Sequence, residues 1–185
     1  MKEYRININY AKALFMLASD LKEEERVMDD MRLVNDVCRE NHLLNVVLDN
    51  PTLQEAKKVG IVKSLFGGHV SNTTLAFLEF VTRKRRTVYL KGISDAYMAF
   101  YRDSRNIVLS EVKTADYMSD EVYEGIRNKV AAYSGKKVEL VKVLDSNMLG
   151  GACITFDNNM YDARLRTKIA QLRKEFSKNV YEKKL

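Results

Sequence analysis

The sequence predicts a mainly α-helical fold in which a six-helix bundle is followed by a small α+β domain. The chain of 185 residues contains a single proline and eight glycines, so few residues interrupt a helix. Apolar residues recur at helical spacing through residues 1–105. A run of alternating, β-branched residues begins after Asn106, and we therefore expect one domain over residues 1–105 and another over residues 106–185.

The composition favours a folded protein. Hydrophobic residues make up 46% of the chain and charged residues 30%, as in packed domains. No apolar run reaches the roughly 18 residues that a membrane span needs, and the first ten residues lack the apolar core of a signal peptide. We expect a cytosolic protein, or one that meets a membrane only through partners. The net charge of +6 is compatible with nucleic acid, an anionic membrane or an acidic protein as partner.

The first two helices are predicted from apolar stripes. The first covers residues 9–21, with a stripe of Tyr10, Leu14, Leu17 and Leu21. Small residues in the same segment allow another helix to pack closely, namely Ala11, Ala13 and Ala18. The second helix follows the acidic residues 23–25, which complement the positive end of its dipole. Its stripe consists of Val27, Met31, Val34 and Cys38.

Turn residues separate the third and fourth helices. A short apolar segment over residues 43–48 is stopped by Asp49-Asn50-Pro51. Thr52 is expected to cap the fourth helix, with Glu55 at the capping-box position. Gly67-Gly68 ends this helix, whose apolar side consists of Ala56, Val59, Val62 and Phe66.

The fifth helix is expected to be central and largely enclosed. Ser71 begins it, and residues 73–82 leave little polar surface because they include Leu75, Phe77, Leu78, Phe80 and Val81. A sixth helix follows the basic residues 83–86 and ends near Arg105. Its stripe consists of Leu90, Ile93, Tyr97, Phe100 and Tyr101.

The remaining residues predict a small α+β unit. A strand over residues 107–112 precedes a helix from Ser119, whose apolar residues are Val122, Ile126, Val130 and Tyr133. Two further strands cover residues 138–144 and 151–156, and Asp157-Asn158-Asn159 turns the second of them into a hairpin with Met160 and Tyr161. The chain ends in an amphipathic helix with a stripe of Leu165, Ile169, Leu172 and Phe176.

No group of residues has the spacing of a catalytic, metal or cofactor site. His42 and His69 have no cysteine or glutamate at ligand spacing. Cys38 and Cys153 lie far apart in the sequence and are expected to be buried. Gly150-Gly151 lacks the residues of a phosphate-binding loop and is expected to form a bulge or the tight start of a strand. We therefore expect no catalytic residue, no metal and no cofactor.

Two other classes of function stay open, a basic RNA-binding module and an unrecognised enzyme. The basic residues 83–86 could contact phosphates, although a basic turn between helices is usually solvated. The chain has no Gly-x-x-Gly loop and no RNP-like series, and its positive charges are interleaved with acids. Binding with a salt dependence typical of several phosphate contacts would support the RNA-binding module. Catalytic turnover that is lost when one histidine or carboxylate is changed would support the enzyme.

Several segments resemble the delta subunits of F-type ATP synthases, the family of the mitochondrial oligomycin-sensitivity-conferring protein. The segments occur in the family's order and are distributed along nearly the whole chain. They are residues 8–15, residues 77–86, Ile93, Tyr97, residues 112–115, residues 145–151 and Tyr161-Asp162. The last motif departs from the family pattern, which often has Gly-Ser where this chain has Ala163-Arg164, and often glycine in place of Thr167. The departures concern the detailed contacts of this motif.

The resemblance implies a non-catalytic stator subunit, one copy per complex, in a synthase that translocates protons or sodium ions. It would join the catalytic head to the peripheral stalk and bind no nucleotide. In the family, the six-helix domain receives the N-terminal helices of the alpha subunits of the head. Carried over to this chain, the contact residues are Tyr10, Ala11, Ala13, Leu14, Leu17, Phe77, Leu78 and Val81. The same residues could equally form the core of the domain.

By the same resemblance, the C-terminal domain meets the b subunits of the peripheral stalk. The candidate contacts are Gly150, Gly151, Asp162, Leu165, Ile169 and Leu172. For the terminal helix, packing of its stripe within its own domain is the favoured alternative. The resemblance also implies a peripheral position on the cytoplasmic side of the cell membrane, reached through protein partners and without nucleic acid.

Overall fold

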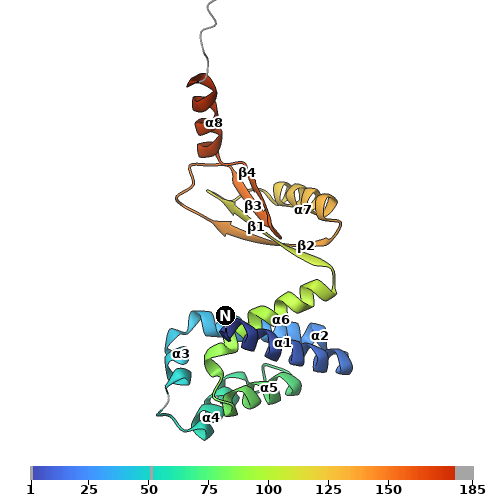
Figure 1. Ribbon diagram of the computed structural model, residues 1–185, viewed down its shortest axis with the longest axis vertical. Helices are drawn as coiled ribbons and strands as arrows, with labels where there is room; N and C mark the ends of the chain where they lie inside the picture. The colour runs from blue at the N-terminus through green and yellow to red at the C-terminus, as the bar shows by residue number, and fades with distance from the viewer. Residues whose placement is uncertain (1, 51, 178–185) are drawn as a thin grey trace, which may run out of the picture. The chain divides into compact units, whose positions relative to one another are not determined.

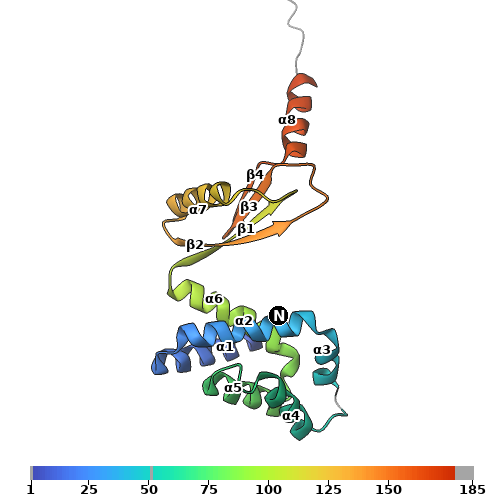
Figure 2. The same cartoon turned by 180° about the vertical axis from the view of Figure 1, so that it is seen from behind.

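The computed structural model describes residues 2–50 and 52–177. Within these residues the chain is mainly helical, with eight α-helices and one four-stranded mixed sheet (Figures 1 and 2). The chain divides into two compact units, Met1–Arg105 and Asn106–Leu185. None of the described helices combines the length and the hydropathy of a membrane span.

The first unit is helical throughout. Its elements are α1 (Lys2–Leu21), α2 (Glu24–Glu40), α3 (His42–Asp49), α4 (Glu55–Phe66), α5 (Asn72–Arg83), a 3₁₀ turn over Thr87–Tyr89 and α6 (Leu90–Ser104). Helix α1 begins at Lys2 instead of residue 9, although residues 6–8, Ile-Asn-Ile, have only moderate helix propensity. Packing of α1 along α6 explains the longer helix, because tertiary contacts override a weak local preference.

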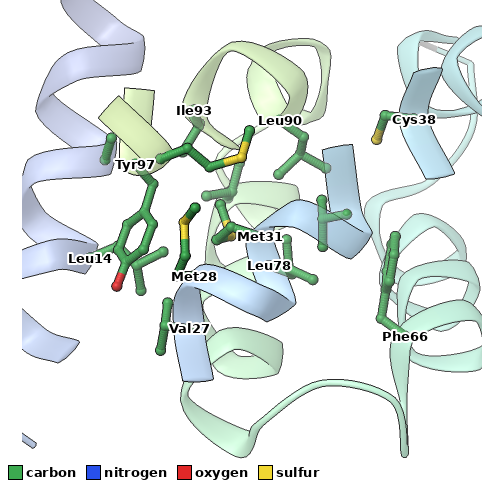
Figure 3. Packing of buried hydrophobic residues seen from close by; sticks show 14 of the residues in the cluster. Leu14, Val27, Met28, Met31, Cys38, Phe66, Leu78, Leu90, Ile93 and Tyr97 are labelled. Carbon is green, nitrogen blue, oxygen red and sulfur yellow. The ribbon is translucent and has the colours of Figure 1, made fainter. Parts of the chain in front are cut away.

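The core of the first unit lies between α1, α2, α5 and α6. Figure 3 shows Leu14 and Met31 near Leu78, Ile93 and Tyr97, and none of these side chains is more than 1% exposed. The expected stripe of α2 is buried as predicted, Cys38 included. These contacts fix which side of each helix faces inward, and so also which side is left for partners.

The predicted cap of α4 is wrong. The N-cap residue is Gln54, and the helix begins at Glu55. The backbone N–H and the hydroxyl of Thr52 both donate to Oδ1 of Asn50, at 3.0 and 2.6 Å. Asn50 therefore forms a local turn that competes with capping, because short polar side chains bond readily to nearby backbone. Glu55 pairs instead with Arg85, which follows α5.

Helix α5 begins as predicted but is not enclosed. Ser71 is its N-cap, and the hydroxyl oxygen of Ser71 accepts a hydrogen bond from the N–H of Thr74. Leu78 and Val81 are buried, whereas Phe80 is 49% exposed. The prediction of an enclosed helix fails because the neighbours α2 and α4 cover only part of its surface.

The second unit is a mixed sheet with one crossover helix. Its elements are β1 (Ile107–Thr114), α7 (Asp120–Ser134), β2 (Lys137–Leu144), β3 (Ala152–Phe156), β4 (Asn159–Asp162) and α8 (Leu165–Ser177). The strand order is β2-β1-β3-β4, with β1 and β2 parallel and the other pairs antiparallel. A parallel pair needs a crossover, which α7 supplies. The predicted hairpin of β3 and β4 is present.

Helix α7 covers one face of the sheet. Val130 packs against Val108 and Phe156, with Ile126 beside them. The expected stripe is partly wrong, because Val122 is exposed and the neighbouring Tyr123 is buried under the ammonium of Lys142, 4.1 Å from the ring centroid. Residues 122 and 123 both fit a helical period, and packing on β2 selects the tyrosine.

Candidate docking surfaces

An apolar groove lies between α1 and α5. It has a volume of about 330 Å³ and is lined by Asn9, Tyr10, Ala13, Leu14, Leu17, Phe77 and Phe80. The methyl side chain of Ala13 adds little bulk to the α1 side of the groove. Helices α1 and α5 lie side by side in both views of the chain (Figures 1 and 2). We refer to this feature as the α1/α5 groove.

Aromatic rings form one wall of the α1/α5 groove. The ring centroid of Tyr10 lies 6.4 Å from that of Phe77 and 6.2 Å from that of Phe80. Phe80 and Leu17, on the two helices, are each nearly half exposed, at 49% and 46%. Exposed apolar side chains that gather along a hollow are typical of a protein-binding surface.

Positive charge lies at the edge of the same groove. The guanidinium of Arg86 donates to the hydroxyl oxygen of Tyr10 at 2.9 Å and stands 5.2 Å from the centroid of that ring. The ammonium of Lys84 lies 5.6 Å from the centroid of Phe80. A helix with an apolar stripe and an acidic residue beside it would match this surface.

A buried carboxylate holds the start of α5 against α2. Oδ2 of Asp30 accepts hydrogen bonds from the N–H of Ser71 at 2.9 Å, from the hydroxyl of Ser71 at 2.6 Å and from the hydroxyl of Thr74 at 2.7 Å. These bonds fix the position of the helix that forms one wall of the groove. Sequence reasoning missed Asp30, although a charged residue next to the buried stripe residue Met31 was a usable signal.

The eight residues expected to contact a partner helix fall into two groups. Five of them line the α1/α5 groove, namely Tyr10, Ala13, Leu14, Leu17 and Phe77. Ala11, Leu78 and Val81 lie in the core with 0% exposure and cannot reach a partner. Phe80 also lines the groove; it lies within the matching segment 77–86, three residues after Phe77, but is not among the eight residues.

A second apolar surface runs along α8. Leu165, Ile169, Leu172 and Phe176 share one face of this helix, and each is between 46% and 77% exposed. No described residue of α8 is buried, and both views show the helix extending beyond the sheet (Figures 1 and 2). The favoured alternative, packing of this stripe within its own domain, is therefore wrong. We refer to these four residues as the α8 stripe.

The glycine pair lies at the start of α8. Gly150 and Gly151 have φ angles of 146° and 86°, and the N–H of Leu165 donates to the carbonyl of Gly150 at 3.0 Å. A Cβ atom on Gly151 would collide with the carbonyl oxygen of Ala163. The pair forms the tight start of β3, as expected, and it supports α8 by packing rather than by offering side chains to a partner.

Asp162 serves the same junction. Its two oxygens accept from the N–H and Nε of Arg164, both at 2.9 Å, from Nη2 of Arg164 at 2.6 Å and from the hydroxyl of Thr167 at 2.9 Å. The side-chain hydrogen bonds from Arg164, followed by its backbone N–H, hold the pKa of Asp162 well below its usual range. Two of the three residues that depart from the family pattern, Arg164 and Thr167, thus build a local brace between β4 and α8.

The described residues show no centre for metal chemistry. Among residues 2–50 and 52–177, no cluster of three or more His, Cys, Asp or Glu side chains could hold a metal ion. Cys38 and Cys153 are both buried, and burial raises the pKa of the Cys38 thiol. His69 is an exposed loop residue. The features that stand out in the described part of the chain are apolar surfaces.

Comparisons with known proteins agree on one family. The family model described as ATP synthase delta (OSCP) subunit matches residues 6–176. The chain is 32% identical to ATP synthase subunit delta of Cytophaga hutchinsonii over 180 residues, covering 97% of this chain and 98% of that protein. It is 30% identical to the same subunit of Synechococcus elongatus over 164 residues, covering 88% and 91%.

The fold is also similar to that of a solved structure. A chain in the cryo-EM structure of the Toxoplasma gondii mitochondrial ATP synthase hexamer matches with a TM-score of 0.72 at 16% identity. The match covers 94% of this chain and 98% of that chain, so the similarity extends over both compact units.

Proposed function

Because the chain belongs to the ATP synthase delta (OSCP) subunit family, we propose that it is the stator element that links the catalytic head to the peripheral stalk. The delta subunit is a non-catalytic part of the complex that makes ATP. One copy per complex would stop the head from turning with the central stalk, so that torque from proton or sodium movement is used for synthesis. Its place at the cytoplasmic side of the membrane would depend on its partners.

The observation that carries this proposal is that each compact unit has an exposed apolar surface of its own. The α1/α5 groove belongs to the first unit and the α8 stripe to the second. A connector needs two separate binding sites, and the two surfaces lie on different parts of the chain. We assign the six helices of residues 1–105 to the head and residues 106–185 to the stalk.

The groove suits the N-terminal helix of an alpha subunit. A helix that docks in a groove inserts apolar anchors spaced by three or four residues. Tyr10, Leu17, Phe77 and Phe80 offer apolar contact area, and Ala13 lets the partner approach closely. Arg86 at the edge would favour an acidic residue on the partner.

The assignment of the groove can be tested on the full chain by calorimetry with a peptide from the N-terminus of the cognate alpha subunit. We expect one-to-one binding at micromolar affinity or better. Ala13→Asp places a charge in the apolar groove and should weaken binding at least about tenfold. Ala132→Asp, the same change at an exposed position of α7, is the control. Equal affinity of the two variants would refute the groove.

The α8 stripe suits the C-terminal helices of the b subunits. The four apolar side chains of this helix face are only partly covered within the described part of the unit, and a partner helix would bury them further. Leu172→Asp should weaken binding of a peptide from the C-terminus of the b subunit at least about tenfold. Gln171→Asp adds the same charge to the adjacent position of the same helix and should change affinity much less.

A basic nucleic-acid-binding module is not favoured. Arg85 of the basic turn pairs with Glu55, and Arg83 lies 3.7 Å from Glu79. Lys84 and Arg86 lie against the aromatic rings of the groove. The basic turn is therefore engaged with neighbouring protein groups, whereas nucleic-acid binding needs several cations directed at phosphates.

A further inference from the structure

A second groove lies between α1 and α6. Its volume is about 490 Å³, larger than that of the α1/α5 groove, and the two share no lining residue. Neither the family resemblance nor the proposed function uses this surface. We refer to it as the α1/α6 groove.

Small side chains of α6 follow the length of this groove. Gly92, Ala96 and Ala99 are spaced by four and three residues, so they lie on one face of the helix. Ala96 and Ala99 leave room for a partner helix to approach the α6 backbone, whereas the space beside Gly92 is taken by the side chain of Asn7. The groove is not simply a gap between loosely packed helices, because a Cβ atom on Gly92 would collide with the side chain of Asn7 on α1.

Larger apolar groups border the small residues. Tyr4 and Ile8 come from α1, and Phe100 from α6. The Tyr4 side chain is 70% exposed, although its ring could cover considerable apolar area. The groove therefore combines space for a helix with aromatic and aliphatic side chains that a partner would bury.

The charge of this groove is opposite to that of the first. Asp95 and Asp103 both line it, and among its described lining residues there is no lysine or arginine. The two acids are eight residues apart on α6, which corresponds to about 12 Å along the helix axis. Asn35 donates to Oδ1 of Asp95 at 2.9 Å, which orients that carboxylate.

Besides the two carboxylates, a buried side-chain oxygen of Asn7 is a hydrogen-bond acceptor at this groove. Asn7 lines the groove, and among the described residues its Oδ1 atom is buried without a hydrogen-bond partner. A buried polar atom normally has a partner, because losing its hydrogen bond to water costs free energy. A Lys or Arg side chain entering the groove could supply donors to the two carboxylates, and to this oxygen once the Asn7 side chain turns toward the groove.

We propose that the α1/α6 groove binds a basic amphipathic helix from another subunit of the same complex. The partner helix carries Lys or Arg residues seven or eight positions apart, matching Asp95 and Asp103, and a strip of small or aliphatic residues that packs on Ala96 and Ala99. Helix α1 is then flanked by two partner helices of opposite charge, one in each groove. The charges prevent exchange of the two partners between the grooves.

The probe for this site is a synthetic 18-residue helical peptide with a Leu/Ala face and two lysines eight positions apart. A matched peptide carries glutamates at these two positions. The full chain, labelled with ¹⁵N, is titrated with each peptide. The amide signals of Ala96 and Ala99 report on the α1/α6 groove, and the amide signal of Ala13 reports on the α1/α5 groove. We expect the lysine peptide to bind saturably and to shift the signals of Ala96 and Ala99.

Charge variants separate this site from the α1/α5 groove. The double variant Asp95→Asn with Asp103→Asn keeps the shapes of both side chains and should weaken lysine-peptide binding at least about fivefold, since it removes two ion pairs. Ala13→Asp, which changes only the α1/α5 groove, should leave the affinity for the lysine peptide unchanged. A failure of this inference can therefore be told apart from a failure of the proposed binding of an alpha subunit. The inference is overturned if the lysine peptide does not bind, or if it shifts only the signal of Ala13. It is also overturned if the lysine peptide binds the double variant as tightly as the wild-type chain, or if the glutamate peptide binds the α1/α6 groove as tightly as the lysine peptide does.

Discussion

At the scale of single residues, two carboxylates hold elements in place rather than do chemistry. Asp30 is only 7% exposed and accepts three hydrogen bonds from the start of α5. Asp162 receives Arg164 and Thr167 at the start of α8. Each acid lies behind one proposed docking surface, so its loss should reach the partner indirectly, through the position of a helix.

Replacing Asp30 by alanine should destabilise the first unit. The substitution leaves the hydroxyls of Ser71 and Thr74 without their acceptor in a buried place, and we expect the free energy of unfolding to fall by about 3 kcal/mol. Urea unfolding followed by circular dichroism measures the change. Asp29→Ala, at the exposed neighbouring position, is the control and should have an effect below about 1 kcal/mol.

The brace at Asp162 should weaken in acid. Because hydrogen bonds from Arg164 lower the pKa of Asp162 in the folded chain, its contribution to stability is present above the unfolded pKa of about 4 and is lost as the pH falls through the lower folded value. The amide signal of Arg164 should therefore keep its position as the pH falls through about 4 and move only well below that value, where Asp162 is protonated in the folded chain. Asp162→Asn should abolish this movement, whereas Asp157→Asn should retain it. A wild-type signal that moves with a midpoint of about 4, the value of an unpaired aspartate, would contradict the brace.

At the scale of elements, the exposed faces follow from what each helix packs against. Helix α7 covers one face of the sheet with Val130 and Ile126, whereas α8 begins at the end of β4 and has no buried residue among those described. Helix α5 buries Leu78 and Val81 and leaves Phe80 in the groove. The apolar residues that remain outside on α5 and α8 are the ones that we assign to partners.

Two glycines provide a test of the junction before α8. Gly151→Ala should destabilise the second unit by about 2 kcal/mol, because the residue has a positive φ and the new methyl group meets the backbone at Ala163. Gly125→Ala on α7 meets open space and should stabilise by up to about 1 kcal/mol. Thermal unfolding of the two variants shows whether each substitution lowers or raises the stability. A Gly151→Ala variant as stable as the wild-type chain would contradict the close packing at Ala163.

At the scale of the whole molecule, the two units have separate hydrophobic cores. The cluster around Met31 and Tyr97 and the cluster around Val108 and Val130 share no residue. Units with separate cores unfold as separate cooperative regions. A connector built in this way can bind one partner with each unit.

Hydrogen exchange can test this independence. Met31→Ala leaves a cavity in the first core and should lower its stability by about 3 kcal/mol. Exchange measured by mass spectrometry should then become faster over residues 24–104 and stay unchanged over residues 107–162. Val108→Ala should produce the reverse pattern. Faster exchange throughout the chain in both variants would show a single cooperative unit.

The sequence by itself determined the type and order of the elements. Helical stripes, the Ser71 cap, the Asp157 turn and the change of pattern after Asn106 are encoded over a few neighbouring residues, so each could be predicted locally. The cap at Thr52 failed because Asn50 offered a competing bond of the same short range.

Only the tertiary structure decided which residues face a partner. Ala11 and Ala13 have the same side chain two positions apart on α1, yet the first lies in the core and the second lines a groove. Residues 122 and 123 are similarly divided, and the α8 stripe is exposed although its pattern is typical of a buried helix face. The acidic α1/α6 groove also appears only when residues far apart in the sequence, such as Asn7 and Asp95, come together. Periodicity shows that a helix has an apolar face, but burial depends on contacts between distant segments, which local sequence does not specify.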